Sequence, residues 1–171
     1  MTLIKELLVK ISDLTAEDED GEELVVELQE PLSAEELKSL MEQMPLPQEL
    51  CDFFAVTNGM QLLSAELYDS DSLQYVQGII PFHGFGNGDF TCIATKESDL
   101  PEGSVLFMNH SPDVLVPVAD SLCDWIKKVV AEIQEKGCLL HPADYFSRPD
   151  EQGVYSHVPD DLKGRDCELN R

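Results

Sequence analysis

The stretch PFHGFGNGDFTCIAT, Pro81–Thr95, places three glycines at alternating positions between two apolar runs. Such a run either holds a phosphate group or turns the chain. A dinucleotide-binding loop has the spacing G-x-G-x-x-G and is followed by a helix, whereas here the spacing is G-x-G-x-G and a strand-like run follows. A P-loop needs a lysine, and residues 39–95 contain neither Lys nor Arg. The stretch therefore predicts a β-hairpin that turns at Asn87-Gly88 with positive φ.

Short apolar runs separated by turn residues surround this hairpin, between residues 62 and 118. Sequential strands joined by short turns favour antiparallel pairing. Pro117 should lie at a sheet edge or a strand end, because proline has no N–H to donate to a neighbouring strand. The expected strands are QGIIPF (77–82), FTCIAT (90–95), SVLFMN (104–109) and VLVPV (114–118), with a further one in ELVVELQ (23–29).

Helical spacing of apolar residues appears in four other segments, and cap residues mark several of their ends. Ser33 and Glu36 form a capping-box pattern, and Asn58-Gly59 can end a helix in the left-handed conformation. Ser121 can cap the last helix, which Gly137 ends. The expected helices cover residues 3–14, 33–44, 47–57 and 121–136.

These elements predict an α+β fold, with a mainly antiparallel sheet of about four to six strands and helices packed on one side. Residues 1–137 are expected to form a single domain that includes an acidic N-terminal extension. Residues 138–171 are polar and rich in Pro and Gly, and we expect them to form a loosely packed tail.

The charge is strongly acidic, with a formal net value of −23. Residues 11–95 carry 18 Asp and Glu side chains and one base, Lys38. Such a surface should repel nucleic acid and anionic membranes and should attract basic proteins. An acidic surface that serves only to keep the protein soluble would explain the same composition.

Five cysteines occur without a C-x-x-C pair, and no run approaches the length of a membrane span. The N-terminus lacks the apolar core and cleavage site of a signal peptide. We therefore expect a cytoplasmic protein with reduced cysteines.

No motif predicts a cofactor, a metal or a catalytic group. The segment DSDSLQYVQG, from Asp69, begins like a calcium loop, but its fifth position is Leu73 and its glycine comes too late. The four histidines show no zinc-ligand spacing, and no G-x-S-x-G marks a nucleophile. Surface carboxylates and core histidines are the simpler interpretation, and a hydrolase with a dispersed site stays open.

Four landmarks in order resemble the SUKH superfamily, also known by its SMI/KNR-type members. They are LPQELCDFFAVTNG (46–59), GNGDFTCIAT (86–95), GSVLFMNHSPD (103–113) and SLCDWI (121–126). The resemblance covers residues 33–136, about 60% of the chain. The family has no established catalytic residues, so the resemblance implies a non-catalytic α+β binding domain.

Many bacterial members of that family look like immunity proteins that neutralise a cognate toxin, often a nuclease, whereas fungal members resemble regulatory scaffolds linked to cell-wall synthesis. The resemblance and the charge together favour an immunity-type protein that binds a basic toxin through an acidic surface. A scaffold for endogenous partners is the alternative. The residues expected on the acidic contact face are Glu66, Asp69, Asp71 and Asp89.

Overall fold

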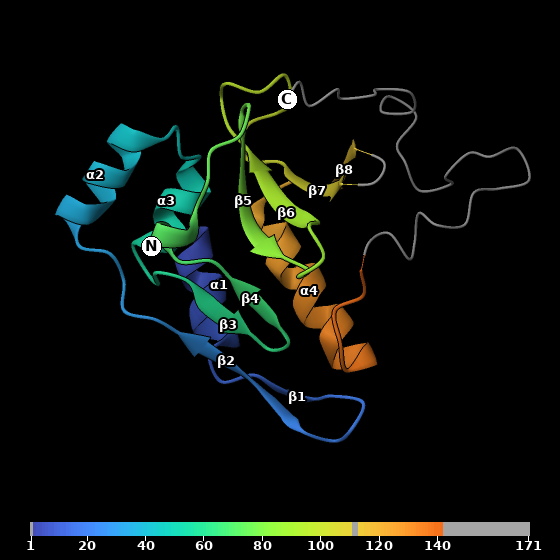
Figure 1. The fold of residues 1–171 in the computed structure, drawn as a ribbon. Helices are drawn as coiled ribbons and strands as arrows, with labels where there is room; N and C mark the ends of the chain where they lie inside the picture. The colour runs from blue at the N-terminus through green and yellow to red at the C-terminus, as the bar shows by residue number, and fades with distance from the viewer. Residues whose placement is uncertain (1, 111–112, 142–171) are drawn as a thin grey trace, which may run out of the picture.

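The computed structural model describes residues 2–110 and 113–141, and its centre is an eight-stranded antiparallel sheet (Figure 1). The strands follow one another in space in the order of the chain, so each pairs with its sequence neighbour. The strands are β1 Thr15–Glu17, β2 Glu23–Leu28, β3 Met60–Leu62, β4 Ala65–Leu67, β5 Ile79–Gly84, β6 Phe90–Ala94, β7 Val105–His110 and β8 Asp113–Ala119.

Four α-helices accompany the sheet, and α1 and α4 lie behind it in Figure 1. The chain inserts α2 and α3 between β2 and β3, which remain paired with each other. The helices are α1 Leu3–Ile11, α2 Ala34–Gln43, α3 Gln48–Phe54 and α4 Leu122–Lys136, and a 3-10 turn, η1, covers Ser70–Ser72.

The α+β class and the antiparallel sheet are confirmed, but the expected count of four to six strands is wrong. The strands predicted in residues 77–118 are observed as β5 to β8, and Pro117 lies on the edge strand β8 as expected. The additional strands β1, β3 and β4 have three residues each. Three residues are too few to show an alternating pattern, and these strands form because longer neighbours pair with them.

The predicted helix caps are confirmed with one change at the end of α3. Ser33 Oγ accepts from the Glu36 N–H and Glu36 Oε2 accepts from the Ser33 N–H, which completes the capping box of α2. The helix α3 ends at Phe54 rather than near residue 57. The Phe54 carbonyl oxygen accepts from the Leu32 N–H, and the Asn58 N–H, which would continue the helix, donates to the Glu30 carbonyl oxygen.

The hairpin between β5 and β6 is present, but its turn differs from the prediction. The Phe85 N–H donates to the Asp89 carbonyl oxygen at 3.1 Å and closes a five-residue loop. Positive φ occurs at Gly86 (+77°) and Gly88 (+96°), and Asn87 does not adopt it. Asn87 instead uses its side chain, whose Oδ1 accepts from the Asp89 N–H at 3.0 Å.

Apolar side chains are buried on both faces of β5 to β7. Ile80, Ile93 and Val105 join the main core between the sheet and the helices. Their neighbours Ile79, Cys92, Ala94 and Leu106 form a smaller cluster on the opposite face, against Val76 and Leu100 from the connecting loops. This double burial explains why β5 and β6 have nearly continuous apolar sequences.

The helix α4 ends at Lys136 and is followed by Gly137, which has φ +74°. Just after it, Leu139 packs against the main core and His141 contacts the β5–β6 hairpin. Residues 142–171, including His157 and Cys167, lie outside the described residues.

None of the helices in the described ranges combines the length and the apolarity needed to cross a bilayer.

Candidate functional site

A β-bulge in β5 directs two adjacent aromatic rings toward α4. The ladder pairs Pro81 with Cys92 and His83 with Thr91, which leaves Phe82 without an opposite residue. Trp125 of α4 packs edge-on against Phe82 at 5.1 Å and lies 5.6 Å from the His83 ring. The bulge therefore brings His83 into the helix-facing core, whereas unbroken alternation along β5 would have turned this side chain to the opposite face.

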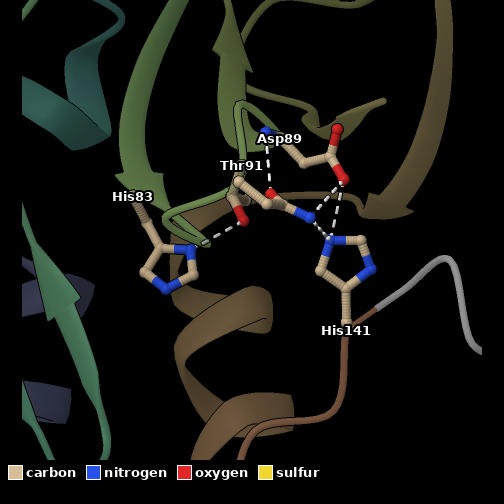
Figure 2. Close-up of polar contacts among 5 residues, drawn as sticks. His83, Asp89, Thr91 and His141 are labelled. Atoms are coloured by element: carbon tan, nitrogen blue, oxygen red, sulfur yellow. Dashed lines mark hydrogen bonds and ion pairs between the residues drawn. The ribbon is translucent and has the colours of Figure 1, made fainter. Parts of the chain in front are cut away.

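His83 is a neutral, buried polar residue at neutral pH. It is only 4% exposed, and its Nδ1 lies 3.1 Å from Thr91 Oγ1 (Figure 2). Burial lowers the pKa of His83 to about 4, because the surroundings disfavour the charged imidazolium. The Thr91 hydroxyl gives the uncharged ring the hydrogen-bond partner that a buried polar group requires.

The second histidine, His141, lies against the tip of the same hairpin although it is 58 residues away in the sequence from His83. Its Nε2 lies 2.8 Å from Asp89 Oδ2, and Asn87 Nδ2 donates to the same carboxylate oxygen at 3.0 Å (Figure 2). The centroid of the His141 ring lies 4.6 Å from that of Phe85 and 5.2 Å from that of Phe107.

We call Phe85, Asn87, Asp89 and Phe107 the Asp89 socket, and His141 occupies it. Asp89 is only 3% exposed, and a carboxylate that is withdrawn from water is costly unless a cation or hydrogen-bond donors compensate it. His141 Nε2 and the Asn87 amide both lie within hydrogen-bonding distance of this carboxylate and offset that cost. The arrangement joins the segment after α4 to the β5–β6 hairpin.

The site supplies neither a metal ligand set nor an activated thiol among the residues that the structure describes. No group of three or more His, Cys, Asp or Glu side chains in that part of the chain could hold a metal ion. Burial raises the pKa of Cys92 to about 12 and that of Cys123 to about 11, so both thiols stay protonated at neutral pH.

The four acids expected on a contact face differ in their exposure to solvent. Glu66 on β4 and Asp71 in η1 are exposed, whereas Asp69 is half-buried and its Oδ1 accepts from the Ser72 N–H at 2.9 Å. Asp89 is buried in its socket, so the expectation that its carboxylate lies on an exposed acidic face is corrected. The hairpin loop was recognised from the sequence, but the direction of its acid was not.

Strand register brings Glu66 together with three acids that were not predicted as site residues from the sequence. Glu17 pairs directly with Glu23, and Glu27 and Glu66 flank Gln61 in neighbouring strands. Val26 and Leu62 are buried toward the helices, so these acids point to the opposite face. We call this surface the acidic sheet face, and its members are Glu17, Glu23, Glu27 and Glu66, all exposed.

The alternation in ELVVELQ was the available signal for Glu23 and Glu27. Glu17 was missed because β1 was interpreted as part of an acidic loop. Inside the Glu17–Asp20 block, Asp18 Oδ1 accepts from the Asp20 and Glu22 N–H groups, which builds the turn of the β1–β2 hairpin.

The family comparison covers most of these elements. The sequence model of the SMI1 / KNR4 family (SUKH-1) matches residues 31–128, from just before α2 into α4. No curated protein matches the chain. The four residues of the Asp89 socket lie inside the matched range, whereas His141 and strands β1 and β2 lie outside it. Because the match spans more than half of the sequence, the chain belongs to the SMI1 / KNR4 family (SUKH-1).

Proposed function

We propose that this protein is a non-catalytic binding module that docks a basic protein through the acidic sheet face. In this proposal it is a cytoplasmic immunity-type protein, and its partner is a cognate toxin such as a nuclease. The observation that carries the proposal is the arrangement of four exposed glutamates on one face of β1 to β4. Residues 11–95, which contain these strands, include Lys38 as their single base, and Lys38 lies on α2.

The charge arrangement suits association with a cationic surface. Glu17 and Glu23 face each other across a strand pair, and like charges in that position repel. A basic partner removes this repulsion, which favours the complex. A nuclease active site is basic because it binds phosphates, so carboxylates in a row can occupy it and block the substrate. Inhibition is then stoichiometric and needs no chemical step.

The partner is first obtained by affinity capture from the host cell and then purified, so that its association can be measured by stopped flow. The test variant carries Glu17→Gln, Glu23→Gln, Glu27→Gln and Glu66→Gln. The matched control removes four exposed acids elsewhere, with Glu35→Gln, Glu42→Gln, Asp99→Asn and Glu102→Gln. The association rate of the test variant should fall about tenfold at low salt, and that of the control should change far less.

The wild-type rate should also fall steeply between about 50 and 500 mM salt, across which the Debye length shortens about threefold. If the captured partner is an enzyme, one equivalent of this protein should abolish its activity. An association rate that does not depend on the salt concentration, or that falls equally in both variants, would contradict docking through the acidic sheet face. A partner that is a housekeeping protein and keeps its activity in the complex would replace the immunity role with that of a regulatory scaffold.

A further inference from the structure

We propose that the Asp89 socket is a binding site for a planar cationic side chain of the basic partner, an arginine guanidinium or a histidine imidazolium. In the unbound chain His141 fills that site, and the partner displaces it. The identity of the partner rests on the proposed function. The chemistry of the socket does not, because small cations can probe it without any partner.

The carboxylate of Asp89 is the reason that the socket selects a cation. The group is 3% exposed and accepts from the Asn87 side-chain amide at 3.0 Å. His141 Nε2 lies 2.8 Å from the same oxygen and 3.2 Å from Asn87 Nδ2, and a buried carboxylate gains more from a cationic partner than from a neutral donor. A cation of another chain that reaches the same oxygen would restore the same compensation.

The aromatic walls are the reason that the socket selects a flat cation. The His141 ring is inclined by 67° to the Phe85 ring and by 88° to the Phe107 ring, with centroid distances of 4.6 and 5.2 Å. Aromatic rings at such distances stabilise guanidinium and imidazolium groups through their quadrupoles. A lysine ammonium group is compact and strongly hydrated, so it would use the two rings less well.

His141 has the position of an exchangeable occupant. The side chain of His141 is 22% exposed, whereas that of Asp89 is 4% exposed. In segment 138–141, Leu139 packs against the main core and His141 lies in the socket. His141 also lies outside the range that matches the family, whereas the socket lies within it. The Asp89 socket thus lies in the part of the chain that matches the family, and His141 lies in the segment that follows that part.

The first experiment empties the socket with His141→Gly in the full chain and adds small molecules at about pH 6, where free imidazole is mostly protonated. The readout is the thermal midpoint. The substitution should lower it by about 3 °C or more, and millimolar imidazole or methylguanidinium should restore most of that loss. Pyrazole, which has the shape of imidazole but stays neutral, should restore little. Adding Asp89→Asn to His141→Gly should abolish the preference for the cations.

Equal rescue by pyrazole and imidazole would overturn the claim that the socket selects charge, and absence of any rescue would overturn the claim that it binds a ligand. If His141→Gly does not fold, His141→Arg and His141→Leu answer the same question. The arginine variant should keep a thermal midpoint close to that of the wild type, because the guanidinium reaches Asp89. The leucine variant should lose several degrees. Equal loss in both variants would overturn the proposal.

The second experiment tests displacement with the captured partner. A chain with His141→Gly should bind the partner several-fold more tightly than the wild type, because the partner no longer has to displace the His141 side chain. Asp89→Asn should weaken binding, and the acidic sheet face variant should change mainly the association rate. Unchanged affinity in both socket variants, together with successful rescue by small cations, would overturn displacement by the partner while leaving docking through the acidic sheet face intact.

Discussion

At the scale of single residues, His83 within β5 and His141 against the tip of the β5–β6 hairpin differ in their surroundings. His83 is buried and lies within hydrogen-bonding distance of the Thr91 hydroxyl. Its burial lowers the pKa of the folded state to about 4 from an ordinary value near 6.5. Between those two values the unfolded chain binds the proton more strongly. The contribution of His83 to stability is therefore fully present above about pH 6.5 and is lost as the pH falls toward about 4, by a total of about 3 kcal/mol.

This loss can be isolated with His83→Gln, which keeps a polar side chain near Thr91 but does not titrate. Urea denaturation of the two proteins between about pH 7 and pH 4 should show the wild type losing about 3 kcal/mol more than the variant. The many surface carboxylates titrate in both proteins, so their effect cancels in the comparison. Parallel stability curves would show that His83 is already accessible to protons in the folded state.

At the scale of elements, α2 is the helix that depends most on its cap. Among its residues only Leu40 is buried, so little packing holds it to α3. Ser33→Ala removes a hydrogen bond that is worth about 1 kcal/mol at a helix N-terminus. The amide protons of α2 should therefore exchange about fivefold faster, while those of α4 keep their protection. Hydrogen exchange measured by mass spectrometry reports both helices.

The matched control for this prediction is Ser39→Ala, an exposed serine in the interior of the same helix. Alanine favours helix formation, so exchange in α2 should not accelerate in this variant. Equal exchange in Ser33→Ala and the wild type would mean that the contact with α3, and not the cap, determines the stability of α2.

At the scale of the whole molecule, the net charge of −23 opposes folding because the acids repel one another. Raising the salt concentration from about 50 to 500 mM should therefore raise the thermal midpoint by about 3 °C or more. Glu17→Gln with Glu23→Gln removes a like-charge cross-strand pair and should reduce this response. The control, Asp99→Asn with Glu102→Gln, should retain more of it. Calorimetry of the three proteins compares the responses, and an identical shift in all three would contradict a local repulsion in the β1–β2 hairpin.

Short stretches of the sequence were enough to predict the elements whose signals are local. The N-cap residues, the apolar periods of the helices and the alternation of the long strands depend on neighbours a few residues away. Ser33, Ser121 and β5 to β8 were therefore recognisable from short stretches of the chain. The order of these landmarks also predicted the family. The three-residue strands escaped recognition, because they exist only through pairing with neighbours.

The directions of the polar side chains of the site depend on contacts between segments that are distant in the sequence. A bulge of one residue turned His83 toward α4, and the five-residue loop turned Asp89 inward, although the sequence pattern had favoured the surface for that acid. The chain after α4 then brought His141 to Asp89 across 52 residues. Such contacts depend on strand register and chain reversal, which short-range patterns do not encode. The sequence thus determined that the surface is acidic, and the fold determined which acids face outward and which one is held by a histidine.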